Sequence, residues 1–251
     1  MLLLELSMTK EYAFMVCVPY NGAENKNLTE GDVILTAMKI SADVSAARFV
    51  VGIDEAGRGP LAGPLGVGAV AMNAIIQHSV LNKLSTGIGI ELRDSKKLSA
   101  RQREAWFLAL EEAEGRGELQ FRVAFVSAQV IDEGGISAAA RLGVARALAR
   151  LTLSPERSLI LLDGLLVAPP RFREQRTLIR GDETEPLIAL ASIVAKVTRD
   201  RKMSTLAVRY PDYGFEKHKG YGTRQHYDQL QKRGVCAIHR RSFCSNIYDG
   251  G

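Results

Sequence analysis

VVGIDEAGRGPLAGP, residues 50–64, is the stretch around which the rest of this chain is organised. Its first four residues are apolar or glycine and rich in β-branched side chains, which predicts a buried strand. Asp54 and Glu55 follow where we expect that strand to end, because neighbours on a strand share one site only at an end or bend. The glycines around Arg58 then predict a loop whose backbone a ligand can approach closely.

An acidic pair beside a basic, glycine-rich loop is typical of a metal ion held next to a phosphate. The competing interpretation is a strand, a tight turn and a surface ion pair without a bound ligand. The loop directly behind Asp54 and Glu55 favours the metal and phosphate interpretation.

Apolar periodicity predicts further strands and helices after this stretch. Residues 65–72 are expected to return antiparallel to the first strand, because the loop between them is short enough for a hairpin. The uncharged residues 60–82 contain prolines and glycines, which predicts strand and loop rather than a membrane span. Ser99 and Gln102 form a capping-box pattern that begins a helix, with Gly115 as its stop. The remaining predictions are strands at 121–126, 158–162 and 177–179, a helix at 136–151, and a helix at 187–209 preceded by Pro186.

Strands that come first and then alternate with helices predict an α/β fold, a mixed β-sheet with helices on both faces. A chain of 251 residues suits one core. Residues 1–47 precede the recognisable motifs and form an N-terminal extension of undecided role. Residues 48–251 are expected to form one catalytic domain, including a polar, basic C-terminal segment of loop and helix from about Glu216.

The composition is that of an ordinary globular protein, with 46% hydrophobic and 24% charged residues. A net charge of +5 permits a polyanionic partner without requiring one. Glu5 interrupts the apolar N-terminus and no basic region precedes it, so we expect no secretion signal. Cys17, Cys236 and Cys244 lack zinc spacing and suit inert thiols in a reducing compartment. We therefore expect a cytoplasmic protein without a membrane association, and a monomer.

Two further acids are candidates for the same site as Asp54 and Glu55. Asp163 closes an apolar, strand-like run as Asp54 does, so the two carboxylates meet at one edge if their strands are neighbours. The alternative for Asp163 is the first residue of an Asp-Gly turn. Asp182 lies just before a helix, where an acid also stabilises the helix terminus. Together the four suit hard divalent cations, and without a cation they would repel one another.

Three residues are candidates for contacts to a substrate. Lys96 lies in a polar loop, where it either contacts a phosphate or remains solvated. Ser192 and Lys196 are four residues apart on one predicted helix face, so both are expected to face the acidic edge. Lys196 is expected to neutralise or position rather than to catalyse. Asp200 is expected to take part in a helical ion pair rather than to be a metal ligand.

The segment from Lys217 to Arg241 holds seven lysines and arginines against one acid, Asp228. A run of charge is usually a solvated face, but here Tyr221 stands between two glycines, which exposes an aromatic ring. We expect this segment to follow a nucleic-acid backbone, with Arg240 and Arg241 among the contacts. No Ser-His-Asp arrangement competes for the chemistry, and the glycine loop lacks the Walker sequence.

DEAGRGPLAGP, from Asp54, resembles the signature of ribonuclease HII, the type 2 ribonuclease H family. The resemblance extends from about Val50 to Phe243 and departs from the family after Phe243, where this chain reads CSNIYDGG. Further segments agree in order: DSKKLS from Asp94, LLDG from Leu161, GDE from Gly181, ASIVAKVTRDR from Ala191, YPDYGFEKHKGYGT from Tyr210 and HRRSF from His239.

The resemblance implies a ribonuclease H-like fold and an endonuclease that cuts the RNA strand of RNA–DNA hybrids by two-metal hydrolysis with Mn²⁺ or Mg²⁺. It implies a cut 5′ of a ribonucleotide, including a single one in duplex DNA, that leaves a 3′-hydroxyl and a 5′-phosphate. Ribonucleotide removal in DNA repair and primer processing in replication follow as roles. The implied catalytic and metal-binding residues are Asp54, Glu55, Asp163 and Asp182, and the implied ribonucleotide-recognising residues are Gly57, Arg58, Gly59 and Tyr221.

Two alternatives stay open on the sequence. A resolvase or integrase of the same fold would cleave all-DNA junctions, and the GRG loop and Tyr221 argue against it. A catalytically silent nucleic-acid-binding protein would bind without a metal and without cleavage, and the presence of all four acids argues against that.

Overall fold

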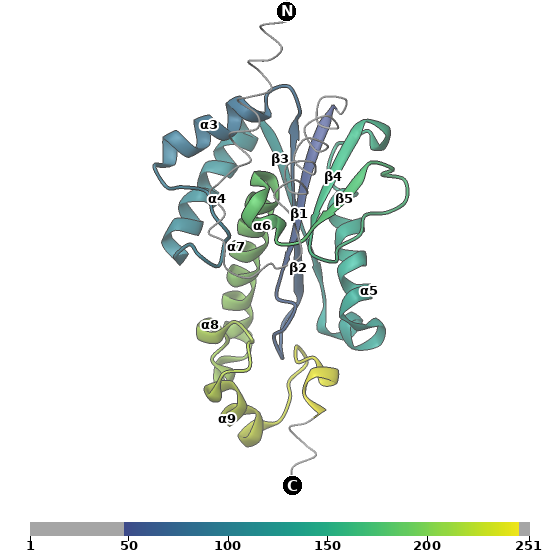
Figure 1. The fold of residues 1–251 in the computed structure, drawn as a ribbon. Coiled ribbons are helices and arrows are strands. Elements are labelled where there is room, and N and C mark those ends of the chain that lie inside the picture. The colour runs from purple at the N-terminus through teal and green to yellow at the C-terminus, as the bar shows by residue number, and fades with distance from the viewer. Residues whose placement is uncertain (1–47, 246–251) are drawn as a thin grey trace, which may run out of the picture.

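The structure is a computed structural model that describes residues 48–245, which form a five-stranded sheet with helices on both faces (Figure 1). The predicted extension 1–47 lies outside the described residues. The strand order is β3-β2-β1-β4-β5, so the sheet is mixed as expected. The strands are β1 (Phe49–Ala56), β2 (Leu65–Asn73), β3 (Leu119–Val126), β4 (Ser158–Asp163) and β5 (Gln175–Leu178).

Strand β1 is the centre of the sheet because both of its neighbours form continuous ladders with it. It runs antiparallel to β2, as the hairpin prediction requires, and parallel to β4. Its ladder with β2 continues to Ala56, one residue beyond the acidic pair, so the pair lies at the end of the strand as expected. The ladder with β4 ends one step before Asp54, at the pair Ile53 and Leu162. The next position places Asp54 beside Asp163.

Helices α3 (Gln77–Ile88), α4 (Ala100–Gly115) and α7 (Pro186–Arg209) cover one face of the sheet. Helix α7 lies directly on β1 and β2 because both strands carry glycine at the contact. A Cβ atom on Gly52 would lie 2.2 Å from the carbonyl carbon of Leu187, and one on Gly68 would lie 2.5 Å from the carbonyl oxygen of Ala191. This close approach sets the position of the next residue along the helix, Ser192.

Helix α5 (Ala128–Leu148) covers the other face, against β2 and β3. It begins at Ala128 rather than at 136, because Ser127 caps it and the chain passes through Gly135 with a positive φ of 76°. The adjacent glycines Gly134 and Gly135 interrupt the apolar periodicity, so the sequence pattern did not predict this first part of the helix. Helix α3 was also missed, because residues 60–82 were interpreted as strand and loop. The capping box of Ser99 and Gln102 is confirmed.

The C-terminal part of the chain lies below the sheet in Figure 1, at the tip of the β1–β2 hairpin. It packs a third apolar cluster that includes Leu61, Met203 and Phe215. None of the helices in residues 48–245 is long and apolar enough to cross a membrane. The short elements are α6 (Gly181–Thr184), α8 (Phe215–His218), α9 (Arg224–Arg233) and the 3-10 turns Pro155–Arg157, Pro211–Tyr213 and Arg241–Phe243.

Candidate active site

The sheet and the start of α6 bring the predicted acids to one edge. Asp54 and Asp163 lie at matching positions of the parallel strands β1 and β4, on the face that α7 covers. An oxygen of the Asp163 carboxylate accepts a hydrogen bond from the N–H of Gly181 at 2.7 Å, which ties β4 to α6. Asp182 is the next residue and is buried. The juxtaposition expected for Asp54 and Asp163 is therefore present, and Asp182 lies beside it.

Burial raises the pKa of two acids of this edge, Asp54 and Glu55. Burial raises the pKa of Asp54 well above its ordinary value, and repulsion by Glu55 and Asp163 adds to it, while a hydrogen bond from Ser192 opposes the rise. Burial also raises the pKa of Glu55, against the lowering effect of Arg58. A crowded set of partly desolvated carboxylates is stabilised by a nearby cation.

Two side chains supply positive charge within this edge. Arg58 Nη1 lies 3.0 Å from Glu55 Oε1, and Lys96 Nζ lies 3.2 Å from Asp182 Oδ2. The pKa of Asp182 is nevertheless raised, because its burial outweighs the attraction of Lys96. Neither of the two interpretations of Lys96 describes it fully, because its ammonium group already pairs with Asp182, one of the predicted acids.

The oxygen donors of this edge fit a hard divalent cation by their chemistry. The second carboxylate oxygen of Glu55 is buried and has no hydrogen-bond partner, so it can accept a ligand without losing a bond. In residues 48–245, however, no three acidic, histidine or cysteine side chains converge closely enough to hold one ion. In this arrangement Glu55 is paired through its other oxygen with Arg58, and Asp182 is paired with Lys96.

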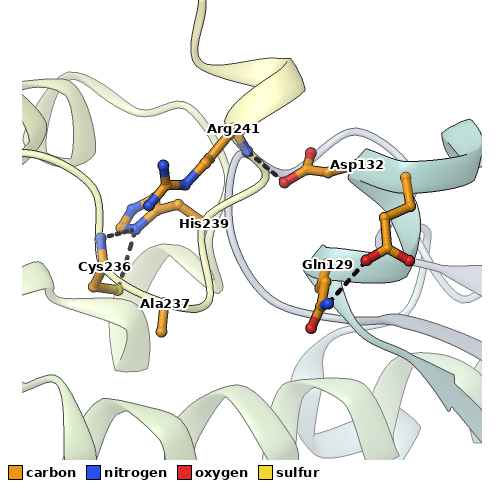
Figure 2. Close-up of a pocket in the computed structure, with 7 residues that line it drawn as sticks. Gln129, Asp132, Cys236, Ala237, His239 and Arg241 are labelled. Carbon is orange, nitrogen blue, oxygen red and sulfur yellow. Dashed lines mark hydrogen bonds between the residues drawn. The ribbon is translucent and has the colours of Figure 1, made fainter.

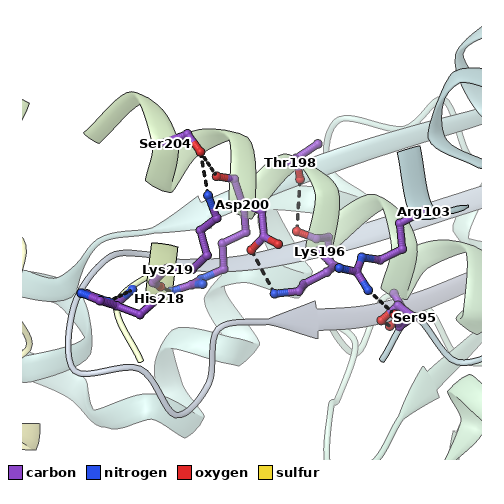
Figure 3. A network of polar contacts seen from close by, with 12 residues as sticks. Ser95, Arg103, Lys196, Thr198, Asp200, Ser204, His218 and Lys219 are labelled. Atoms are coloured by element: carbon purple, nitrogen blue, oxygen red, sulfur yellow. Dashed lines mark hydrogen bonds and ion pairs between the residues drawn. The ribbon is translucent and has the colours of Figure 1, made fainter. Parts of the chain in front are cut away.

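Ser192 and Lys196, expected to share one direction, have different partners. The Ser192 hydroxyl is hydrogen-bonded to Asp54 and lies 2.7 Å from the hydroxyl of Ser95. Lys196 Nζ lies 3.0 Å from Asp200, so the prediction of a helical ion pair is confirmed (Figure 3). Its ammonium also lies 5.8 Å from the centre of the Tyr221 ring. Ser192 therefore faces the acidic edge as expected, whereas Lys196 faces Tyr221 and Asp200 instead.

The loop that carries Lys96 contributes residues that the sequence analysis did not select. Asp94 is buried, accepts a hydrogen bond from the backbone of Lys96, and raises the pKa of Asp182. Ser95 is buried against Ser192. Both lie in the DSKKLS segment, and their position in this motif is the sequence feature that could have predicted their place at the site.

The two segments predicted to recognise a ribonucleotide are joined by backbone contacts. The N–H groups of Leu61 and Ala62, just after the GRG loop, donate to the carbonyl oxygen of Gly220 at 2.9 and 3.3 Å. A Cβ on Gly220 would lie 2.2 Å from the carbonyl oxygen of Ala62, so only glycine permits this approach. Tyr221 as a residue remains 41% exposed. It is therefore held beside the GRG loop with a face open to solvent.

Arg240 does not face solvent, so the expectation that it contacts a phosphate backbone was wrong. Its side chain is fully buried, and it donates to the carbonyl oxygens of Gly57 at 2.6 Å, Arg58 at 2.8 Å and Gly63 at 3.0 and 3.1 Å. Burial lowers the pKa of Arg240 to about 10, and the neighbouring Arg199 adds to this. Arg240 thus fixes the path of the GRG loop.

Arg199, on α7, is a second buried guanidinium with backbone partners. It donates to the carbonyl oxygens of Pro64 at 2.9 Å and Lys219 at 3.1 Å, and so connects the two segments predicted to recognise a ribonucleotide. Its guanidinium carbon lies 5.7 Å from the centre of the Tyr221 ring. The sequence did not predict the role of either arginine. Both bind backbone carbonyl groups, which every residue has, so no side-chain motif indicates the contact.

A cavity of about 410 Å³ lies against the C-terminal segment (Figure 2). It contains none of the four predicted acids, so it is separate from the acidic edge. Its lining residues are Gln129, Asp132, Glu133, Cys236, Ala237, His239 and Arg241.

Comparison with known proteins identifies the family of this chain. The model of the ribonuclease HII family matches residues 51–246. The chain is 43% identical over 200 residues to a ribonuclease HII of Caldicellulosiruptor bescii, which covers 80% of this chain and 88% of the relative. The crystal structure of ribonuclease H2 from Pyrococcus horikoshii OT3 aligns with a TM-score of 0.62 and 29% identity, over 80% of this chain and 97% of that one.

A structure of Bst-RNase HIII in complex with Mn²⁺ has a TM-score of 0.55 at 16% identity, over 96% of this chain and 81% of that one, which supports the fold alone. With the family model spanning the acidic edge, the GRG loop and Tyr221, this chain belongs to the ribonuclease HII family of endoribonucleases, which act on the RNA of RNA–DNA hybrids.

Proposed function

We propose that this protein cuts on the 5′ side of ribonucleotides, including a single ribonucleotide embedded in duplex DNA, with two divalent cations at the acidic edge. One observation carries the proposal: Arg58 of the GRG loop lies 3.0 Å from Glu55, and the residues just after that loop bond to Gly220, the neighbour of Tyr221. A site that cleaves at one sugar needs its reactive groups and its recognition groups to be neighbours. Removal of ribonucleotides from DNA and processing of RNA primers are the roles that fit this activity.

In this proposal Asp54, Glu55, Asp163 and Asp182 hold the cations, Mg²⁺ or Mn²⁺. When bound, two such ions activate a water and stabilise the leaving oxygen of an in-line displacement. Ser192 keeps the Asp54 carboxylate oriented through its hydrogen bond. Lys96 holds Asp182 and is exposed enough to reach a phosphate as well.

Recognition of the ribonucleotide falls to groups that can read a 2′-hydroxyl, which both donates and accepts a hydrogen bond. The backbone of Gly57, Arg58 and Gly59 can approach a sugar closely, and Arg240 already fixes the carbonyl groups of two of these residues. Tyr221 adds an exposed ring that can stack on the neighbouring sugar or base and a hydroxyl that can reach the 2′ oxygen. Lys196 and Arg199 lie beside that ring and give it a cationic surround.

The test uses three labelled duplexes: one with a single ribonucleotide in DNA, one an RNA–DNA hybrid, and one all DNA. Each is incubated with the protein and Mg²⁺, Mn²⁺ or a chelator. We expect cleavage 5′ of the single ribonucleotide, cleavage of the hybrid, no cleavage of the all-DNA duplex, and no cleavage with chelator. Cleavage of all-DNA duplex at a similar rate would favour the resolvase alternative.

Two variants separate catalysis from binding. Asp54→Asn removes a proposed ligand and should abolish cleavage while substrate still binds. The matched control is Asp212→Asn, which removes a carboxylate that only pairs with Arg233 at the surface. Full activity of Asp54→Asn in Mg²⁺ would overturn the ligand assignment, and metal-independent binding by the wild type without cleavage would favour a silent binding protein.

A further inference from the structure

A chain of hydrogen bonds runs through two buried histidines to the backbone of Tyr221. The backbone N–H of Cys236 donates to Nδ1 of His239 at 2.9 Å, a contact visible in Figure 2. Nε2 of His239 lies 3.0 Å from Nε2 of His226, and Nδ1 of His226 lies 3.0 Å from the carbonyl oxygen of Tyr221. His226 and His239 are 0% and 3% exposed.

The ends of this chain fix the proton positions within it. Because Nδ1 of His239 accepts from an N–H, it carries no proton, so the proton of His239 is on Nε2 and is donated to His226. Nε2 of His226 is then an acceptor, and its proton is on Nδ1, where it is donated to the Tyr221 carbonyl. Every link is satisfied only when both rings are neutral and hold these two tautomers.

We infer that His226 and His239 are positioning residues, a pair of neutral imidazoles that fixes the backbone of Tyr221 and with it the ring that reads the ribonucleotide. This inference rests on the proposed role of Tyr221. This series of hydrogen bonds positions Tyr221 more specifically than apolar packing would. The Tyr221 carbonyl is held by a directed bond that no apolar side chain can replace.

The surroundings keep both rings neutral. Burial lowers the pKa of His226 and of His239 to about 4, and the repulsion between them adds to the effect for His239. Around them, His218 stacks on His226 at 4.4 Å, and the rings of Phe215 and Tyr213 lie against His239. His218 bonds to Tyr213 and to the N–H of Gly220, so it holds the same turn from its other side.

The first test reads the tautomers directly and does not depend on activity. In protein labelled with ¹⁵N at histidine, long-range ¹H–¹⁵N spectra at neutral pH should show His226 protonated at Nδ1 and His239 at Nε2. Spectra of His226→Asn and His239→Asn assign the two rings. A His226 ring protonated at Nε2, or either ring in its charged form, would overturn the inference.

The second test measures the rate on the single-ribonucleotide duplex divided by the rate on the long hybrid. His226→Phe keeps a ring without hydrogen bonds and should lower this ratio about fivefold to tenfold, the effect of one lost hydrogen bond. His226→Asn keeps an N–H near the position of Nδ1 and should retain most of the ratio. In a Tyr221→Ala background, His226→Phe should change the ratio no further.

Leu230→Ala is the matched structural control, because Leu230 lies one turn from His226 on α9 and is buried in the third apolar cluster, whose member Phe215 contacts the His226 ring. It should lower the melting temperature and leave the ratio unchanged. An unchanged ratio in His226→Phe, or an equal fall in Leu230→Ala, would overturn the positioning role. If Tyr221→Ala itself leaves the ratio unchanged, the proposed function of Tyr221 fails, and the tautomer spectra still decide whether the chain of bonds exists.

Discussion

The four acids differ in how their neighbours hold them. Asp54 has Ser192 as a hydrogen-bond donor, Glu55 has Arg58, and Asp182 has Lys96. Asp163 instead binds the backbone of Gly181 at the start of α6. A substitution at each of these positions therefore removes a different interaction, and Asp182→Asn tests one of them at the scale of a single residue.

Asp182→Asn should lower turnover by far more than it lowers substrate affinity. The substitution keeps the size of the side chain but removes the charge that pairs with Lys96 and, in the proposed function, binds a cation. Single-turnover rates and binding constants on the hybrid duplex measure the two effects separately. Unchanged turnover with only a lower melting temperature would instead identify Asp182 as an acid that stabilises the helix start.

Arg240→Ala and Arg241→Ala should behave differently although the residues are neighbours. Arg240 is buried with bonds to three carbonyl groups, so its loss should cost at least about 2 kcal/mol of unfolding free energy. Arg241 is exposed at its side chain, so its loss should change stability by less than about 0.5 kcal/mol and flatten the salt dependence of binding. Chemical denaturation and binding at several salt concentrations provide the measurements, and a stable Arg240→Ala would contradict the buried geometry.

At the scale of elements, α7 joins most of the site. It carries Ser192 toward the acidic edge, and Lys196 and Arg199 toward Tyr221. Its N-terminus is capped by Glu185, which is buried and accepts a hydrogen bond from the N–H of Leu187. The cap of this helix is therefore a carboxylate inside the protein, and its protonation should affect stability.

Glu185→Gln should increase stability at pH 8 and have little effect at pH 4. Burial raises the pKa of Glu185 to about 7 from 4.5, so the folded protein holds this proton more tightly than the unfolded chain does. Its contribution is fully present below pH 4.5 and is lost as the pH rises through about 7, on the order of 3 kcal/mol. Glutamine keeps the acceptor without the ionisation. Denaturation curves of both proteins across this pH range should converge in acid, and parallel curves would refute the effect.

At the scale of the whole molecule, the sheet and α6 bring acids from distant segments together, so cation binding should stabilise the fold. A cation that binds only the folded form at 100 times its dissociation constant adds about 2.7 kcal/mol. Melting temperature should therefore rise with the concentration of Mg²⁺ or Mn²⁺ in the wild type. The rise should disappear in Asp54→Asn and persist in Asp212→Asn, and an equal rise in all three would place the cation elsewhere.

The sequence alone determined the strands, the hairpin after residue 64, the capping box and most of helix 187–209, because each depends on residues close in the chain. It also selected the four acids as candidates, by their motifs and by the apolar runs that end at Asp54 and Asp163. Helix α3 and the start of α5 escaped it, because glycines and an uncharged stretch weakened the periodicity there.

Only the tertiary structure decided which charged side chains face solvent. Arg240 and Arg241 are adjacent and chemically identical in the sequence, yet Arg240 is buried among the carbonyl groups of the GRG loop. Likewise, the histidines that hold Tyr221 come from a helix and a loop that meet only after folding. Backbone carbonyls and ring tautomers have no sequence signature, because they acquire partners only when distant segments of the chain pack together.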